Sequence, residues 1–261
     1  MIRFALPLIL VLALPAVARA DPLPPGLEDA ALLPPYRTEA GTWMTALRLE
    51  LSPGWKTYWR SPGDSGVPPR FDWAGMTNLD HAGARWPRPE VIDSGGERTL
   101  GYHDALVLPI ELAPAVPGQP VAGRVEVELG LCLNVCVPAD LTLTLPLPAD
   151  TPDPRITAAL AQVPVPVEAA LTCALTEIAD GVRVAASVGA PLTDGTAAAL
   201  ELGRPEVWVS APEVTARDGR LTATADFVPP AAKPFPLDPA EVRLTLIGRE
   251  GAVEYQGCDP A

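Results

Sequence analysis

Two cysteines, Cys132 and Cys136, are the residues of this sequence best suited to covalent chemistry. They lie four residues apart in VELGLCLNVCVPADLTL, between two runs in which apolar and polar residues alternate as in half-buried β-strands. In one straight strand they would stand about 13 Å apart, whereas the Cα atoms of a disulfide lie about 5.5 Å apart. We therefore expect a hairpin loop over residues 133–135, in which Asn134 accepts a left-handed conformation and the cysteines face each other.

The small ring that a Cys132–Cys136 disulfide would close bears on its use. A ring of about five residues stabilises a fold by about 2 kcal/mol on the loop-entropy estimate, which is little for a structural bond. A small ring is also prone to strain, which raises the reduction potential and suits a bond that opens and closes. From the residues alone, redox exchange is the leading interpretation, while a structural clip and a metal site stay open.

The other two cysteines, Cys173 and Cys258, are far apart in the sequence. A bond between them would close about 86 residues and stabilise the fold by about 4.6 kcal/mol on the same estimate. We expect a structural disulfide that ties the first strand of a C-terminal domain to its last.

The N-terminus, MIRFALPLILVLALPAVARA, has the parts of a secretory signal peptide. Arg3 is followed by an apolar run over residues 4–14 and by an A-x-A cleavage signal before Asp21. We expect cleavage after Ala20 and export of a soluble protein, because the run is too short to span a bilayer; a retained N-terminal anchor is the alternative. In an oxidising compartment, four cysteines favour disulfides over a zinc site.

The composition argues against a nucleic-acid partner. The formal net charge is −13, and Lys56 and Lys233 are the two lysines of the chain, so it lacks the clustered cations that phosphate binding needs. The 33 prolines break helix interiors and central strands but are tolerated at turns and strand ends. This distribution is typical of many short strands joined by loops.

Alternation recurs along the chain and predicts an all-β protein. In the first half it is clearest over residues 42–51, 105–112, 123–131 and 140–147, and in the second half Asp-Gly pairs at 180–181 and 218–219 mark hairpin turns. We predict two β-sandwich domains, residues 21–148 and 170–261. A Pro-rich linker over residues 149–169, with a short helix near 154–162, joins them.

The aromatic residues of GWKTYWR indicate a site surface in the first domain. Trp55, Tyr58 and Trp59 are hard to bury together, because neighbouring strand residues point to opposite faces. Trp43 and Trp73 are expected in the core.

Several polar residues are weaker candidates. A carboxylate beside a buried thiol raises the pKa of the thiol or moves a proton during exchange. The carboxylates near the expected site are Asp64, Asp93, Glu97 and Asp104. Each of them also fits an ordinary solvated charge in a loop. His103 is a candidate base or metal ligand. With His81 and Met76 it leaves open a soft-ligand site for Cu(I) on the cysteine pair. The sequence has no dedicated metal motif, cofactor signature or Ser/His/Asp arrangement.

Four stretches, taken in order, resemble the N-terminal periplasmic domain of DsbD-type thiol:disulfide interchange proteins and of related suppressor-of-copper-sensitivity proteins. They are SPGWKTYWRSPGDSGVPPRFDW, WPRPE, GYHDALVLPIEL and CLNVCVPA, within residues 33–148. The resemblance implies an immunoglobulin-like sandwich. Its cysteine pair would accept electrons from a membrane-embedded thiol donor and pass them to periplasmic thioredoxin-like or disulfide isomerase-like proteins. By position, Cys132 and Cys136 match the redox pair and Tyr58 the aromatic residue beside it. The segment 92–102, with Asp93, Glu97 and Tyr102, matches a loop that caps the pair.

The sequence also departs from the family. Three residues separate the cysteines, a tighter spacing than in the best-known members, and the tip of the expected cap, Ser94-Gly95-Gly96, carries no aromatic residue. The membrane domain and the thioredoxin-like domain are not present, so we expect the electron donor to be a separate protein.

We therefore predict a periplasmic electron carrier of the protein-disulfide reductase type, without a cofactor or bound metal, whose second domain is a binding module. Cys136, which leads into the Val137-Pro138 bend, is the favoured attacking cysteine. A copper-binding or copper-tolerance protein and a non-catalytic structural module are the alternatives.

Overall fold

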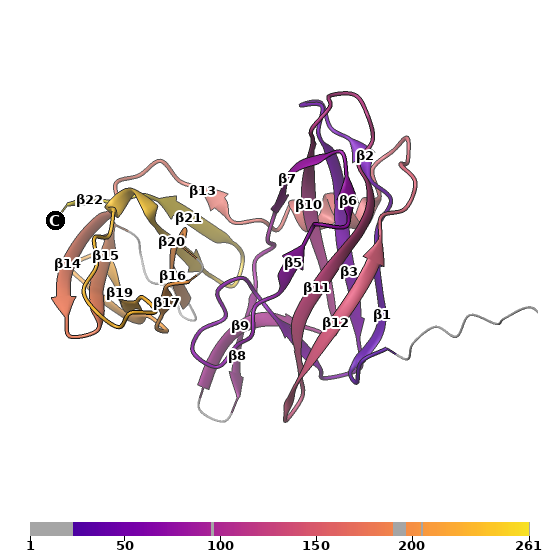
Figure 1. Cartoon of the computed structure of the whole chain (residues 1–261). Helices are drawn as coiled ribbons and strands as arrows, with labels where there is room; N and C mark the ends of the chain where they lie inside the picture. The colour runs from indigo at the N-terminus through magenta and orange to yellow at the C-terminus, as the bar shows by residue number, and fades with distance from the viewer. Residues whose placement is uncertain (1–22, 95–96, 190–196, 205, 261) are drawn as a thin grey trace, which may run out of the picture.

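The computed structural model describes residues 23–94, 97–189, 197–204 and 206–260, and it is built of strands with one short α-helix in that part of the chain. Figure 1 shows two β-sandwich domains side by side, connected by a single crossing of the chain. The predicted fold class, two immunoglobulin-like sandwiches with a helical connector, is confirmed. The predicted signal peptide and its cleavage site lie outside the described residues.

One sheet of the first domain is built on the strands with the clearest alternation. Its order is β1–β3–β10–β7, with β2 paired to β3. The strands are β1 (Leu27–Leu32), β2 (Tyr36–Arg37), β3 (Trp43–Leu51), β7 (Leu79–Ala84) and β10 (Ala105–Pro114). In the two central strands, Leu47, Leu49, Leu108 and Ile110 are fully buried, so this sheet supplies one wall of the aliphatic core.

The second sheet of this domain runs β12–β11–β4–β9–β8, with β5 and β6 also paired to β11. The strands are β4 (Lys56–Tyr58), β5 (Arg70–Asp72), β6 (Met76–Thr77), β8 (Glu90–Ser94), β9 (Glu97–His103), β11 (Ala122–Cys132) and β12 (Cys136–Thr144). On β11, Val125, Val127, Leu129 and Leu131 point into the sandwich and are at most 2% exposed. Because strand residues alternate between faces, Cys132 lies on the outer face of this sheet.

The predicted linker contains ordered structure. Helix α1 (Pro154–Leu160) begins at Asp153, whose carboxylate accepts a hydrogen bond from the Arg155 backbone N–H. Its buried Ile156 packs against Leu33, Met44 and Ala46 of the first domain. Strand β13 (Val165–Pro166) pairs in parallel with β21 of the second domain. The exact domain boundaries stay a prediction, although the helix forms where the sequence places it.

The second domain also has two sheets, β13–β21–β20–β16 and β17–β19–β15–β14–β22, with β18 paired to β19. The strands are β14 (Thr172–Ile178), β15 (Gly181–Val188), β16 (Ala197–Leu202), β17 (Trp208–Val209), β18 (Glu213–Arg217), β19 (Arg220–Val228), β20 (Val242–Ile247), β21 (Ala252–Gln256) and β22 (Asp259–Pro260), and a 3₁₀ turn (Pro239–Glu241) precedes β20. The Asp218-Gly219 turn has positive φ at both residues, as the two-residue hairpin requires.

A disulfide joins Cys173 on β14 to Cys258, between β21 and β22. The bond therefore ties the start of the second domain to its end, which is the arrangement expected from the loop-entropy argument. We call it the second-domain disulfide.

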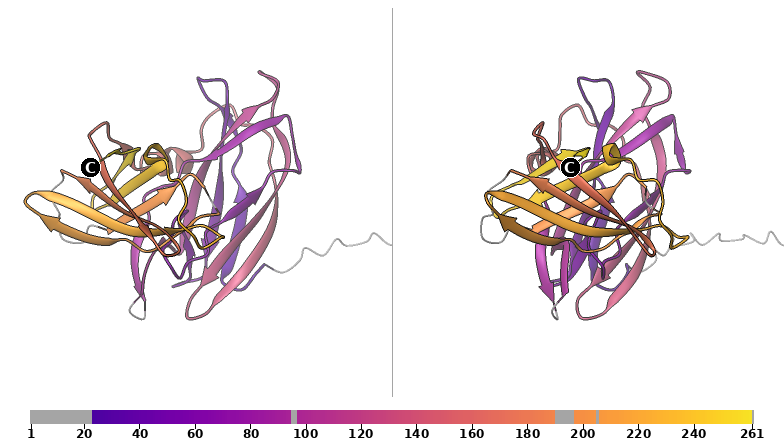
Figure 2. Two further views of the ribbon diagram at one scale, coloured as in Figure 1. Left: turned by 60° about the vertical axis from the view of Figure 1, so that its left-hand side comes forward. Right: turned by 90° about the vertical axis from the view of Figure 1, so that its left-hand side faces the viewer.

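The two domains pack against each other and bury part of their surfaces in the contact. Ala197, Ala199, Ile247 and Ala252 of the second domain belong to the same apolar cluster as the core of the first. Arg88 of the first domain donates a hydrogen bond to the Gly248 carbonyl oxygen at 2.8 Å. Figure 2 shows the two domains from two further directions.

Candidate redox site

The cysteine pair closes the β11–β12 hairpin. Cys132 and Cys136 are directly opposite in the strand register, with Cα atoms 4.1 Å apart, and their sulfurs are bonded. The loop between them is residues 133–135, as the spacing predicts. The expected left-handed Asn134 is wrong: among the described non-glycine residues, positive φ occurs at Asn78, Asp104, Asp218 and Ala232. We call this bond the hairpin disulfide.

The two cysteine residues differ in their exposure to solvent. Cys132 is 2% exposed, whereas Cys136 is an exposed residue at the strand edge of the hairpin. Leu133 and Val135 of the loop are also exposed. Cys136 is therefore the more accessible of the two cysteines to a nucleophile from solvent.

Tyr58 touches both sulfurs. Its hydroxyl oxygen lies 3.0 Å from Cys132 Sγ and 3.2 Å from Cys136 Sγ, and its side chain is buried. A hydroxyl at this distance can donate a hydrogen bond to a thiolate, and hydrogen bonds to a charged acceptor are stronger than those between neutral groups. Tyr58 is thus placed to stabilise the sulfur anion that forms when the bond opens. Trp59, the next residue, points to the opposite face and is fully buried in the core.

Two glycines make the slot that holds the Tyr58 ring. A Cβ atom on Gly130 of β11 would lie 3.3 Å from the ring, and one on Gly66 would lie 2.9 Å from it and 2.2 Å from Pro62. Gly101 of β9 is paired directly opposite Tyr58. A side chain at Gly66 or Gly130 would therefore crowd the Tyr58 ring. Sequence reasoning missed these glycines, although Gly130 lies inside an alternating strand, where a glycine is a signal of close approach.

Lys56 is a further residue that sequence reasoning missed. It is paired across the sheet with Cys132 on one side and with His103 on the other, so its side chain shares their face. It is 8% exposed, which is unusual for a lysine. An ammonium group next to a cysteine favours the thiolate over the thiol. The available signal was the period-two spacing of Lys56 and Tyr58 on one strand.

The segment expected to cap the pair is a β-hairpin. Residues 92–94 belong to β8 and residues 97–102 to β9, and β4 separates β9 from the cysteine strand. In Figure 1, the β8–β9 pair lies toward the same end of the first domain as the turn that joins β11 to β12. Gly95 and Gly96, at the predicted tip, lie outside the described residues.

Two of the predicted neighbours on this hairpin, Asp93 and Tyr102, are not brought to the sulfurs. Asp93 pairs with Arg98 at 3.2 Å on the surface. Tyr102 is paired with Thr57, so it lies on the inner face, where its hydroxyl donates to the Pro87 carbonyl oxygen at 2.8 Å. Burial raises the Tyr102 pKa well above its ordinary value, which keeps this donor protonated. Glu97 belongs to β9, and its side chain lies outside what is described.

The remaining polar candidates have local partners. Asp104 accepts a hydrogen bond from the Gly54 backbone N–H at 2.9 Å, and Asp64 accepts one from the Ala211 N–H of the second domain at 2.9 Å. His103 Nδ1 lies 2.8 Å from a carboxylate oxygen of Glu90.

The Cu(I) site that would combine Met76 with the cysteines is wrong. Met76 pairs with Gly123 at the opposite end of β11 from Cys132, about 30 Å along the strand. Within the described ranges, no group of three or more His, Cys, Asp or Glu side chains is arranged to hold a metal ion. The described helices are all too short or too polar to cross a bilayer.

Comparisons with known proteins support the family resemblance. A sequence comparison with curated proteins gave no match. The structure is similar to the crystal structure of the N-terminal periplasmic domain of ScsB from Proteus mirabilis, with a TM-score of 0.59 and 25% sequence identity. The match covers 85% of this chain and 89% of the ScsB domain. Residues 29–148 match the sequence model of the family "Thiol:disulfide interchange protein DsbD, N-terminal". The resemblance predicted from the sequence is therefore confirmed: the first domain is similar to the DsbD N-terminal domain, and the chain is similar in structure to the periplasmic domain of a DsbD-like protein.

Proposed function

We propose that this protein is a periplasmic thiol:disulfide interchange protein that carries two electrons at a time on Cys132 and Cys136. The observation that carries the proposal is the Tyr58 hydroxyl within hydrogen-bond distance of both sulfurs, beside a cysteine pair of which one member is buried and the other exposed. A disulfide that is purely structural never opens to a thiolate, so it does not need a hydrogen-bond donor placed to stabilise one. The match of residues 29–148 to a thiol:disulfide interchange family points the same way.

In the proposed forward step, the Cys136 thiolate attacks one sulfur of a partner disulfide. A bond forms between Cys136 Sγ and that sulfur, the partner's S–S bond breaks, and the electron pair leaves on the partner's second sulfur. The Cys132 thiolate then attacks Cys136 Sγ, which closes the hairpin disulfide and releases the partner as a dithiol. The partner gains two electrons and this protein loses two.

Recharging runs through the same bonds in reverse. A donor thiolate attacks the exposed Cys136 Sγ, the hairpin disulfide breaks, and the electron pair moves to Cys132 Sγ, where the Tyr58 hydroxyl donates a hydrogen bond to it. A second donor thiolate then releases Cys136. We propose a membrane-embedded thiol protein as the donor, and periplasmic thioredoxin-like or disulfide isomerase-like proteins as acceptors.

Single serine variants test the assignment of roles. Cys132→Ser retains the attacking thiol but lacks the resolving one, so it should accumulate a mixed disulfide with an acceptor of thioredoxin-like or isomerase-like sequence. Cys136→Ser should form none. The double variant serves as the blank, and thermal unfolding checks that each chain is folded, since the ring contributes about 2 kcal/mol. Folded single variants that both fail to trap an acceptor would make the pair a structural clip.

A further inference from the structure

The segment that follows β4 packs over Tyr58. Residues 60–67 leave the strand and turn back across its outer face, and the Leu100 N–H donates to the Pro62 carbonyl oxygen at 3.0 Å. A Cβ atom on Gly130 would lie 3.0 Å from Val67, and one on Gly66 would meet both Pro62 and the Tyr58 ring. The ring is therefore enclosed between β11 and this segment. We call residues 60–67 the covering segment.

The second domain holds the start of the covering segment through Arg60. The guanidinium donates two hydrogen bonds to Glu201, at 2.8 and 2.9 Å, and a third to Glu254 at 2.5 Å. The Arg60 side chain is 17% exposed and stacks over the Trp59 ring at 4.3 Å. Burial by itself lowers the Arg60 pKa, but the hydrogen bonds and charges of the two carboxylates outweigh it and raise the pKa above its ordinary value. This planar fork fixes the direction in which the chain leaves β4.

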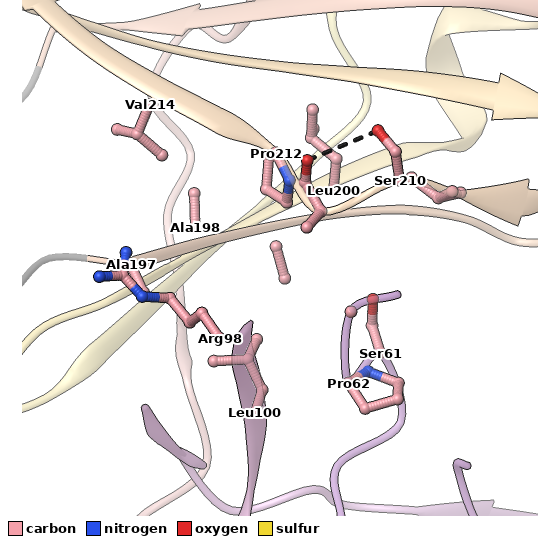
Figure 3. A pocket seen from close by; sticks show the side chains of 14 residues that line it. Ser61, Pro62, Arg98, Leu100, Ala197, Ala198, Leu200, Ser210, Pro212 and Val214 are labelled. Atoms are coloured by element: carbon pink, nitrogen blue, oxygen red, sulfur yellow. Dashed lines mark hydrogen bonds between the residues drawn. The ribbon is translucent and has the colours of Figure 1, made fainter. Parts of the chain in front are cut away.

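A second anchor lies four residues further on. The Asp64 carboxylate accepts a hydrogen bond from the Ala211 backbone N–H, just after β17, at 2.9 Å. Between the anchors, a cavity of about 60 Å³ separates residues 61–63 from β16 and Pro212. Figure 3 shows Ser61 and Pro62 on one side of this cavity, and Ala198 and Pro212 on the other. Close packing against the second domain therefore does not fix this part of the segment. It is held by the hydrogen bond from Leu100 within the first domain and by the two polar anchors to the second.

We infer that the second domain tunes the hairpin disulfide, because it holds the covering segment at Arg60 and Asp64 and so keeps the Tyr58 hydroxyl on the sulfurs. This inference rests on the proposed function and gives the second domain a part in it. Arg60 and Asp64 are positioning residues, since neither touches a sulfur. When a thiolate attacks Cys136, the electron pair passes to Cys132 Sγ. The rate then depends on the hydrogen bond that Tyr58 donates to that anion.

The test uses dithiothreitol as the reductant, so that it needs no biological partner. The second-order rate constant for reduction of the hairpin disulfide is measured in the full exported chain carrying Asp64→Ala or Glu201→Gln. Each variant should react about three- to tenfold more slowly, which corresponds to the loss of one hydrogen bond. Glu111→Gln is the matched control. Its carboxylate also pairs with an arginine, Arg85, but in the other sheet of the first domain.

Repeating the measurement in Tyr58→Phe chains separates an effect on the position of the Tyr58 hydroxyl from a general loosening of the fold. In Tyr58→Phe chains the hydroxyl is already absent, so Asp64→Ala and Glu201→Gln should slow reduction no further. Unchanged rates in the wild-type background would overturn the inference, as would faster reduction, or a slowing that is equally large in the Tyr58→Phe background. Thermal unfolding of the same chains verifies that the second domain stays folded. Because no acceptor is used, failure here leaves the mixed-disulfide test of the proposed function unaffected.

Discussion

Replacing Tyr58 with phenylalanine tests the electrostatic part of the site. The substitution keeps the ring in the slot between Gly66 and Gly130 and removes the hydroxyl that lies 3.0 Å from Cys132 Sγ and 3.2 Å from Cys136 Sγ. A hydrogen bond to a charged group contributes about 1.5–3 kcal/mol. Because one pKa unit corresponds to about 1.36 kcal/mol, the Cys132 thiol pKa should rise by about one to two units.

The reduction rate should follow the leaving-group pKa. For the attacking thiol, the logarithm of the exchange rate changes by about 0.5 for each pKa unit, and we apply the same magnitude to the leaving thiol. A rise of one to two units in the Cys132 pKa then slows attack on Cys136 by about three- to tenfold. Stopped-flow reduction by dithiothreitol gives the rate. The thiolate absorbance of a Cys136→Ser chain, followed against pH with and without Tyr58→Phe, gives the pKa.

Tyr36→Phe is the matched control, since Tyr36 lies on β2 in the other sheet of the first domain. It should leave both quantities unchanged. An unaltered rate and an unaltered Cys132 pKa in Tyr58→Phe would show that the hydroxyl does not stabilise the thiolate, and the reasoning from these distances would fail.

Three further predictions concern the surroundings of the site. Lys56→Met should raise the Cys132 thiol pKa by about one unit, because the ammonium opposite this cysteine favours its thiolate; a pH titration of thiolate absorbance in a Cys136→Ser chain would reveal no shift if the charge is too distant. In a glutathione redox series, mass spectrometry should find the hairpin disulfide reduced while the second-domain disulfide stays intact until unfolding; equal potentials would contradict their separate roles. Hydrogen bonds from Arg85 and Thr42 lower the pKa of Glu111 below its ordinary value of 4.5. The ionised Glu111 carboxylate therefore stabilises the folded protein above pH 4.5, and this stabilisation is lost as the pH falls through the pKa that Glu111 has in the folded state. Urea unfolding of Glu111→Gln should therefore show a smaller loss of stability on acidification than the wild type, and parallel pH profiles would refute this.

The sequence was sufficient for the features that depend on local chemistry. Alternation along residues 42–51 and 105–112 predicted the strands that became β3 and β10, because a half-buried strand repeats every two residues. The spacing of Cys132 and Cys136 required a turn, since no straight strand brings residues four apart to bonding distance. The Asp218-Gly219 pair marked its hairpin through the backbone conformations it tolerates.

The tertiary structure decided which side chains meet at the cysteines. Tyr58 and Tyr102 are both strand tyrosines near the site in the sequence, yet alternation on β4 and β9 sends the first to the sulfurs and the second into the core. Met76 lost its predicted role because its partner on β11 is Gly123, at the end of the strand away from Cys132.

The largest gap between sequence and structure concerns the second domain. Nothing in the local pattern near Arg60 indicates that it meets Glu201 and Glu254, which are more than a hundred residues further along the chain. Strand propensity and turn chemistry act over a few residues, whereas the pairing of charges across a domain interface depends on how two complete sandwiches pack. For this reason the cysteine pair could be recognised from the sequence, while the residues that position its tyrosine became visible only in the folded chain.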